Sequence, residues 1–299
     1  MSKKDMPDFN SQILDSNESD INNEGNKNWW QSNPMTYDWD KSLGEPIYNQ
    51  EYFHQIDDIF GEGHSLVNNP RWPEGYILEN FIEYELFNKK EVLEIGCGAG
   101  LVSSHIERAG ANIHSIDLTE EAIRMTKERF KLNQQQGDIR QMDAENLEFD
   151  DCSMDFVVSW GVIHHSSNMT AILDEIYRVL KPNGKAYIMI YHKNSLRYNV
   201  YVRFWLGIMK LKYINNTTEE IAGSITDGFI ARHLTEKEFN EVSSKFSKVA
   251  ITFSDEKTTI LKYLFGIGKI FAPFYFITKP IQKWLAKNWG WYLEAKITK

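Results

Sequence analysis

The chain is poor in cysteine, with only Cys97 and Cys152 in 299 residues. Two cysteines are too few for a disulfide framework or for a zinc site built on cysteine, so we expect a reducing compartment. Residues 1–27 contain no continuous apolar core, which argues against a secretory signal peptide. The longest apolar run near the C-terminus, residues 270–277, is far shorter than the ~20 residues that cross a bilayer. These absences predict a cytoplasmic protein without a transmembrane segment.

Positive charge is also scarce. Lysine and arginine together number 33 against 42 aspartates and glutamates, which gives a net charge of −9. Because nucleic-acid binding requires a basic surface, this balance argues against a general nucleic-acid binder. Histidine, aspartate and glutamate show no grouping with convincing metal-ligand spacing, so we predict no metal site.

The composition changes along the chain. Residues 1–28 are acidic and rich in serine and asparagine, which predicts a disordered tail. Aromatic residues become frequent abruptly at Trp29 and Trp30, so we expect residues 29–74 to form an ordered aromatic extension or lid. Residues 75–299 then make the main domain, with two segments that are too long for ordinary loops, at about 193–230 and 255–289. Such segments at a sheet edge often cover a ligand site, so we interpret them as helical lid insertions.

Within the main domain, short apolar runs alternate with helical periodicity. Strands are expected near residues 92–95, 112–116, 138–142, 155–160, 185–191, 249–253 and 291–297. Thr119 is a candidate N-cap, and Thr235 with Glu238 forms a candidate capping box for a helix to about Phe246. This alternation predicts a parallel sheet covered by helices on both faces.

A glycine-rich loop follows the first of these strands. Its glycines, Gly96, Gly98 and Gly100, allow close backbone approach, and the helix behind them offers unpaired N–H groups to a ligand. The spacing differs from the G-x-G-x-x-G pattern of dinucleotide-binding folds. Glu94 lies two positions before the first glycine, where an anion would be awkward beside a pyrophosphate but suits a positively charged ligand. Asp117 ends the next strand, where a carboxylate can accept both ribose hydroxyls.

These residues resemble the class I S-adenosylmethionine (SAM) dependent methyltransferases, particularly the small-molecule branch called type 11. Further motifs extend the resemblance over residues 91–191, namely 143–147, 159–165 and 178–184. The resemblance implies an α/β, Rossmann-like fold with a seven-stranded, mostly parallel sheet, helices on both faces, an N-terminal extension and helical lid insertions. It also implies SAM as cofactor, S-adenosylhomocysteine as product, and a small-molecule acceptor.

The resemblance assigns roles in cofactor binding residue by residue. Glu94 would lie near the methionyl moiety, which Gly96, Gly98 and the other loop positions Cys97 and Gly100 would approach through their backbone. Asp117 would hold the ribose and Leu118 would pack on the adenine. The remaining assignments are Asp143 and Ala144 at the adenine edge, with Trp160 or Gly161 behind the methionyl group. We expect Cys97 to contribute backbone rather than thiol chemistry.

His164 and His165 are the candidate catalytic residues. They follow the fourth strand at the ligand-binding edge of the sheet, where a histidine could remove a proton from an oxygen or nitrogen acceptor. Alternatively, these imidazoles cap the next helix or line the cofactor cleft. Weaker candidates are His192 and Tyr191 for chemistry, and Tyr37, Trp39 and Arg71 for substrate contact.

Basic and aromatic residues gather in two late segments. Residues 195–213 contain four basic residues and no acid, and residues 258–299 contain seven lysines and one acid, Glu294. Basic residues beside bulky apolar ones suit a peripheral membrane surface. The interpretation we favour here is a lid whose aromatic residues pack while its lysines face water; an edge that attracts an anionic acceptor is a third. The oligomeric state stays open.

Three functions compete at this point. The leading hypothesis is methylation of a small molecule, plausibly a sugar or a lipid-linked intermediate, at oxygen or nitrogen. A second is a SAM-binding regulatory subunit without catalysis. A third, an NAD-dependent oxidoreductase, is disfavoured by the glycine spacing and by Glu94.

Overall fold

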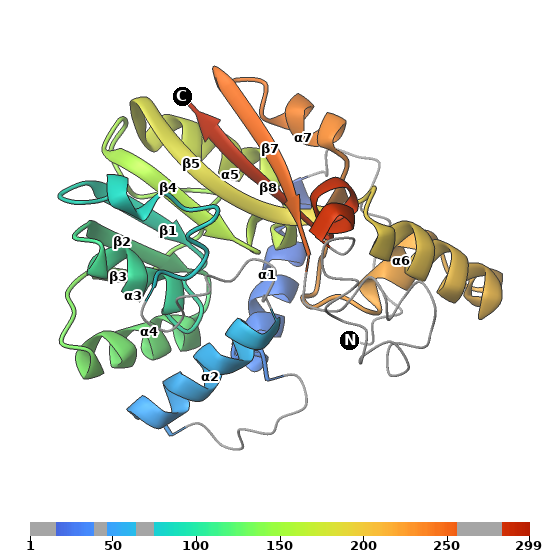
Figure 1. The fold of residues 1–299 in the computed structure, drawn as a ribbon, viewed down its shortest axis with the longest axis horizontal. Coiled ribbons are helices and arrows are strands. Elements are labelled where there is room, and N and C mark those ends of the chain that lie inside the picture. The colour runs from blue at the N-terminus through green and yellow to red at the C-terminus, as the bar shows by residue number, and fades with distance from the viewer. Residues whose placement is uncertain (1–15, 39–46, 64–74, 256–282) are drawn as a thin grey trace.

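The computed structural model describes residues 16–38, 47–63, 75–255 and 283–299. Strands and helices alternate through its central part, as expected (Figure 1). In chain order these elements are β1 (Glu91–Ile95), α3 (Leu101–Arg108), β2 (Asn112–Asp117), α4 (Glu120–Leu132), β3 (Asp138–Gln141), β4 (Met154–Trp160), η3 (Ile163–His165), α5 (Met169–Val179) and β5 (Leu180–His192).

The strands form one sheet in the order β3-β2-β1-β4-β5-β8-β7. The first five are parallel, whereas β8 (Tyr292–Thr298) runs antiparallel to both β5 and β7 (Lys248–Ser254). The predicted mostly parallel sheet is therefore confirmed. An eighth strand, β6 (His233–Leu234), pairs with β5 outside this path and was not expected, because two residues are too short to show a periodic pattern.

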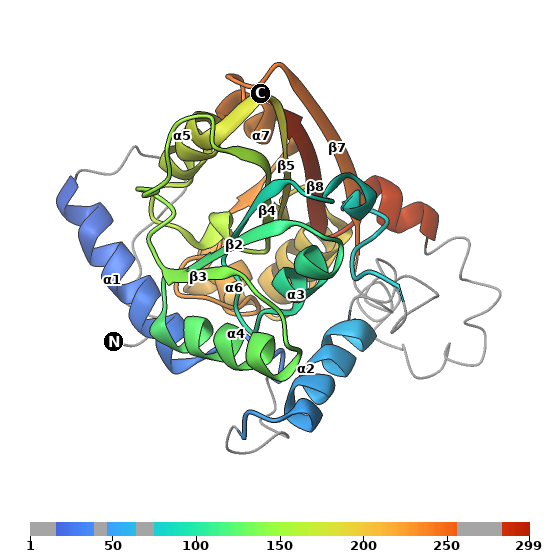
Figure 2. The ribbon, with the colours of Figure 1, turned by 90° about the vertical axis from the view of Figure 1, so that its left-hand side faces the viewer.

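The two faces of the sheet carry separate apolar clusters. Leu93 and Ile95 of β1 point to one face, where they join α5 and Phe239 of α7 (Glu236–Val242). Val92 of the same strand points to the other face, with residues of α3, α4 and the η2 turn (Tyr84–Leu86). Figure 2 shows α5 and α3 on opposite sides of the sheet. Successive side chains of β1 therefore pack into two different apolar cores, as expected for a sheet that is covered on both faces.

Both predicted helix caps are present. The Thr119 side chain accepts a hydrogen bond from the Ala122 N–H, and Thr235 forms a complete capping box with Glu238. Helix α7 ends at Val242 rather than near Phe246. It stops there because the Ser243 hydroxyl donates to the Phe239 carbonyl, and the Phe246 N–H donates to Ser243, which turns the chain toward β7.

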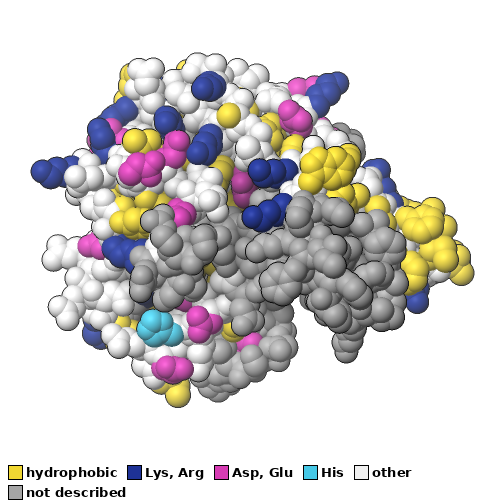
Figure 3. Space-filling model, viewed as in Figure 1, with side chains coloured by type: hydrophobic (Ala, Val, Ile, Leu, Met, Phe, Trp, Pro, Cys, Tyr) yellow, Lys and Arg dark blue, Asp and Glu magenta, His cyan; other side chains and the backbone are white. Residues whose placement is uncertain are grey.

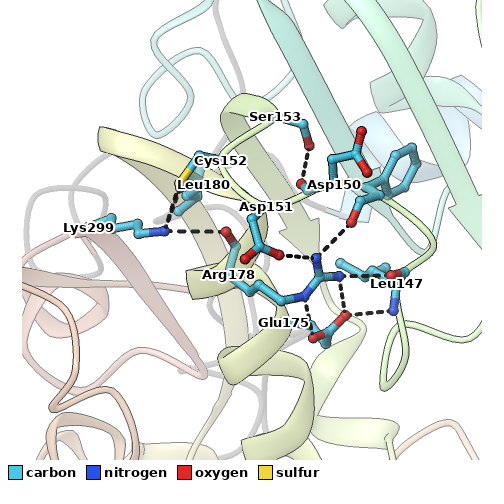
Figure 4. Close-up of polar contacts among 10 residues, drawn as sticks. Leu147, Asp150, Asp151, Cys152, Ser153, Glu175, Arg178, Leu180 and Lys299 are labelled. Carbon is cyan, nitrogen blue, oxygen red and sulfur yellow. Dashed lines mark hydrogen bonds and ion pairs between the residues drawn. The ribbon is translucent and has the colours of Figure 1, made fainter.

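Arg178 is the first residue of the sequence motif at 178–184, and its contacts give this motif a structural role (Figure 4). Its guanidinium donates to both carboxylate oxygens of Glu175, to Asp151, and to the carbonyls of Phe149 and Leu147. The C-terminal Lys299 donates to the carbonyls of Arg178 and Leu180 beside it. This cluster therefore joins the end of α5, the loop before β4 and the last residue of the chain.

The N-terminal region corrects one prediction. Residues 16–28 were expected to be a disordered tail, but they belong to helix α1 (Ser16–Ser32); residues 1–15 lie outside the described part of the chain. The polar sequence of residues 16–28 has little preference of its own for a packed helix. Tertiary contacts hold the C-terminal end of α1. The Trp30 ring packs edge to face against His165 at 5.1 Å between ring centres, and the Gln31 side chain accepts from the first N–H groups of α4 (Figure 2).

The two predicted insertions are only partly described. Between β5 and β6 the chain forms the π-helix η4 (Arg197–Met209), the short η5 (Lys212–Ile214) and α6 (Thr218–Gly223). Of residues 255–289, positions 256–282 lie outside the described residues, and 283–289 are helical. None of the described helices is both long and apolar enough to span a bilayer.

A buried ion pair attaches the N-terminal region to the glycine loop. Arg129 of α4 binds the Asp57 carboxylate of α2 (Gln50–Gly63) through two bonds of 2.9 and 2.7 Å. Its Nε–H also donates to the Ala99 carbonyl at 2.7 Å. The Arg129 side chain is only 4% exposed, so water cannot replace these partners.

We predict that Arg129→Met lowers the free energy of unfolding by about 3–5 kcal/mol, because it leaves the Asp57 carboxylate without its partner. Arg124 lies on the same helix, is 59% exposed and pairs with Glu121. The matched variant Arg124→Met should cost less than about 1 kcal/mol. Urea denaturation of the two variants measures both changes in the free energy of unfolding. Equal decreases would show that the buried Arg129–Asp57 pair stabilises the fold no more than the exposed Arg124–Glu121 pair.

Candidate active site

A cavity of about 690 Å³ opens at the carboxyl ends of the parallel strands. Its floor consists of the glycine loop and the ends of β1, β2 and β4. Its second side comes from β5, η4 and residues 224–227. Its roof is formed by the end of α1 and the segment that follows, with Asn26, Trp29, Trp30, Pro34, Met35 and Tyr37. The chain order reverses between β1 and β4, where ligands bind in open α/β sheets.

The glycine loop needs its glycines for two separate reasons. Gly96 has φ +78°, and a Cβ atom there would lie 2.3 Å from the Val162 side chain. Gly98 also has a positive φ, and its nearest neighbour beyond the loop is Met35 of the roof. Gly100, with φ +75°, lies against Thr126 and does not line the cavity. Gly100 turns the chain into α3.

Glu94 is a buried carboxyl group at the end of β1, only 3% exposed. It accepts a hydrogen bond from the Ser103 hydroxyl of α3, which lies 2.8 Å from the Ser115 hydroxyl of β2. Burial, opposed by the Ser103 bond and reinforced by the charge of Asp117, raises the pKa of Glu94 to about 8. A positive ligand charge beside Glu94 would favour the ionised form.

Two more carboxylates follow at the ends of the neighbouring strands. Asp117 accepts from both the N–H and the hydroxyl of Thr119, at 2.9 and 2.8 Å, and from the Gly98 N–H at 3.2 Å. Asp143, after β3, accepts from the Glu145 N–H at 2.9 Å. Burial raises the pKa of both carboxyl groups, and both line the cavity. Three successive strands therefore present one acidic side chain each.

The structure brings most of the predicted cofactor residues together. Besides the three carboxyl groups, the cavity is lined by Gly96, Cys97, Gly98, Leu118, Ala144, Trp160 and Gly161. The Cys97 thiol accepts a hydrogen bond from Thr126, and burial raises its pKa well above the ordinary range. Cys97 is therefore a neutral thiol, in agreement with its expected backbone role.

The two adjacent histidines occupy different environments. His165 lines the cavity, and its Nδ1 lies within hydrogen-bond distance of the Ile230 carbonyl. Because a carbonyl only accepts, Nδ1 carries the hydrogen and Nε2 carries the lone pair. Nε2 is buried and has no hydrogen-bond partner among the described residues. Burial lowers the pKa of His165, while the charge of Asp227 opposes that change.

His164 and His192 do not reach the cavity. The His164 ring is fully buried between His165 and Tyr191, with ring centres 4.1 and 4.3 Å away. Burial lowers the pKa of His164 well below its ordinary value. His192 stacks on Phe253 and bonds to the Gly290 carbonyl at 3.0 Å. Of the two predicted catalytic histidines, the structure therefore places His165 in the cavity and His164 behind it.

Several cavity residues went unrecognised in the sequence. Asp227 accepts a hydrogen bond from the Tyr191 hydroxyl, and Arg197 lies 4.5 Å above the Trp291 ring. Both residues come from the 193–230 insertion. Its sequence has no periodic pattern that would distinguish residues lining the cavity from residues on the surface. Tyr37, a weak candidate, does line the cavity, whereas Trp39 and Arg71 lie outside the described residues.

The arrangement thus offers carboxylates on three strand ends, a flexible glycine loop and one histidine with a free lone pair. The methyltransferase domain family matches residues 93–188, which contain the glycine loop and all three carboxylates. Over these residues the chain is similar to the methyltransferase domain family.

Curated proteins similar to this chain include ubiquinone biosynthesis O-methyltransferases. The protein of Xanthomonas oryzae pv. oryzae is 30% identical over 124 residues, which are 41% of this chain and 49% of that protein. The Rickettsia akari protein is also 30% identical, over 53% of this chain and 60% of its own length. The chain therefore spans about half the length of the curated relatives it matches.

Solved structures share the fold. The cyclase SpnF has a TM-score of 0.50 at 14% identity, over 80% of this chain and 86% of its own. A SAM-dependent methyltransferase from Methanosarcina mazei has a TM-score of 0.49 at 21% identity, over 75% of this chain and 96% of its own. At 14% identity the likeness to SpnF shows the α/β fold alone.

The cavity suits SAM by the chemistry of its side chains. SAM carries an ammonium and a sulfonium, a ribose diol and an adenine amino group. Glu94 is a buried carboxyl group that no cation pairs with among the described residues, and Asp117 and Asp143 present acceptor oxygens along the same edge. Acidic side chains suit each of these donor or cationic groups.

We predict that Glu94→Gln changes how stability depends on pH. The folded-state pKa of about 8 exceeds the ordinary 4.5, so between these values the folded state holds a proton that the unfolded chain has lost. The free energy of unfolding of the wild type should therefore fall as pH rises through this window, by up to about 1.4 kcal/mol per pH unit. The variant should lack this decrease in urea titrations at several pH values. Parallel wild-type and variant curves would contradict the raised pKa.

Proposed function

We propose that this protein transfers the methyl group of SAM to an oxygen atom of a small-molecule acceptor, with His165 as the general base. The observation that carries the proposal is the state of His165. Its Nδ1–H is directed to the Ile230 carbonyl, its ring lines the cavity, and its Nε2 has no partner among the described residues. A neutral imidazole with an available lone pair is what an acceptor hydroxyl requires.

In this proposal the three carboxylates orient the cofactor. Glu94 attracts the positive charge of the methionyl end, which the Gly96 and Gly98 backbone can approach closely. Asp117 accepts from the ribose hydroxyls, and Leu118 packs on the adenine. Asp143 and Ala144 meet the adenine edge, while Trp160 and Gly161 lie behind the methionyl group. The lining of the cavity by all of these residues supports the assignment.

Bound SAM supplies a methyl group on a sulfonium, whose departure leaves a neutral thioether. Because the leaving group is neutral, the protein does not have to stabilise a charge on it. Its main task is to align the donor and the acceptor. Trp29 and Trp30 of the roof line the cavity, and Trp30 also packs against the ring of the base. The acceptor would occupy the side of the cavity lined by Tyr191, Arg197 and Asp227.

The lowered pKa of His165 has a defined consequence for pH dependence. Its burial keeps the imidazole neutral across the physiological range, so the base is already competent at neutral pH. At saturating SAM, the contribution of His165 to turnover should therefore decline only below about pH 6.5, the ordinary value for histidine. The names of the curated relatives, which are O-methyltransferases, support an oxygen acceptor.

We predict that Asp117→Ala weakens SAM binding by about tenfold or more, because it removes a charged acceptor from the cavity. Asp150 is an exposed carboxylate before β4 that does not line the cavity, so Asp150→Ala is a suitable control. Calorimetric titration with SAM measures both affinities. Wild-type affinity in the Asp117 variant would refute the ribose role.

We predict that His165→Asn lowers the turnover rate by about 100-fold or more while SAM affinity stays within about twofold of wild type. The Asn side-chain amide can keep a donor near the Ile230 carbonyl. The matched control is His192→Asn, which removes another buried imidazole bonded to a carbonyl but lies outside the cavity.

Labelled SAM with cell extract, followed by mass spectrometry for the added methylene mass, identifies the acceptor and then measures turnover. If the wild type binds SAM but methylates nothing, the alternative of a non-catalytic SAM-binding subunit replaces this proposal. If His165→Asn turns over at the wild-type rate, His165 is not the base.

A further inference from the structure

An apolar surface lies at the end of the η4 and η5 elements, far along the chain from the glycine loop. The η4–η5 surface consists of Phe204, Trp205, Ile208, Met209, Leu211 and Ile214, which are between 40% and 72% exposed. Helix η4 is the gold helix at the right of Figure 1, and Figure 3 shows hydrophobic side chains gathered at that end. Soluble monomers rarely leave so many large apolar side chains together in water.

The opposite face of η4 already has its packing partners. Tyr198, Val202 and Leu206 are buried in a cluster with Met189, Tyr191 and Trp291 of the sheet edge. The helix is therefore apolar on both faces, one of which supports the cavity wall while the other stays exposed. An apolar helix face that the described residues leave uncovered requires another occupant.

Basic side chains accompany this apolar surface. Arg203 and Lys210 are exposed and Lys212 is half-buried, and none of them forms an ion pair within the described ranges. The nearest acids along the chain, Glu219 and Glu220, are engaged elsewhere. Glu219 accepts from the Tyr198 hydroxyl, and Glu220 completes the capping box of α6. The surface thus combines apolar side chains with uncompensated positive charge.

We propose that the η4–η5 surface docks on an anionic lipid membrane. Aliphatic, Phe and Trp side chains, with Lys and Arg beside them, suit the boundary between acyl chains and charged headgroups. A second copy of the chain fits less well, because a symmetric contact would bring the three positive charges against their own counterparts.

Docking there has a consequence for the cavity. Helix η4 begins at Arg197, which lines the cavity, and the exposed residues follow along the same helix. A membrane on the η4–η5 surface would therefore lie at the far end of an element that forms one cavity wall. The membrane contact itself does not depend on the proposed methyl transfer.

The test is co-sedimentation of the full chain with vesicles of phosphatidylcholine mixed with phosphatidylglycerol. We expect wild type to sediment with these vesicles, and binding to fall by about tenfold or more in Phe204→Glu/Ile208→Glu and in Arg203→Glu/Lys210→Glu. Removal of phosphatidylglycerol or addition of salt should weaken the wild type as well. Matched controls are Leu86→Glu, which is 39% exposed on η2, and Lys131→Glu/Lys237→Glu on α4 and α7.

Three results would overturn the proposal. Wild type that stays in solution with every vesicle, while the Phe204 variant loses thermal stability, would show that the chain itself covers this surface. Wild type that is dimeric by light scattering and becomes monomeric in the same variant, without vesicle binding, would assign the surface to a second copy. Equal loss of binding in the control variants would show a general charge effect instead of a docking site. Thermal unfolding of every variant distinguishes lost docking from lost folding.

Discussion

Glu94 occupies a position where a carboxyl group can be buried but cannot easily be charged. It is placed there by β1, the central parallel strand whose neighbouring residues fill both cores, and it is held by Ser103 of α3. Burial raises its pKa, and the nearby Asp117 adds to that effect. A ligand that brings positive charge to this point would release the constraint, and the glycine loop leaves the space for it. The polarity of the cavity, and the choice of cofactor, follow from this one group.

The other parts of the site depend on segments that are distant in sequence. Arg129 joins the glycine loop to α2 through Asp57 and Ala99. Trp30 reaches His165 from the N-terminal helix. The Ile230 carbonyl, from the insertion after β5, determines which nitrogen of His165 carries the hydrogen. In the proposed function, the sheet supplies the cofactor side of the cavity, and the added segments line the side where an acceptor would bind.

This division explains which features the sequence could predict. The glycine loop, Glu94, Asp117 and Asp143 follow strands whose apolar runs are visible in the chain, so their common edge could be inferred. Helix α1 could not be inferred, because its polar composition favours disorder and its order comes from contacts such as Trp30 with His165. His164 and His165 are adjacent in the short η3 turn, and only the tertiary structure shows that one faces the cavity. Asp227 lies in an insertion without periodicity, and β6 is too short for a pattern.

The central claim is that a cationic cofactor binds beside the buried Glu94. Calorimetric titration with SAM at neutral pH, in two buffers that differ in ionisation enthalpy, tests it directly. Because the pKa of Glu94 is about 8, the group is largely protonated before binding and should ionise beside the ligand. The account predicts one-to-one binding with release of about one proton, and no release from Glu94→Gln. Absence of SAM binding, or binding of NADH in its place, would contradict it.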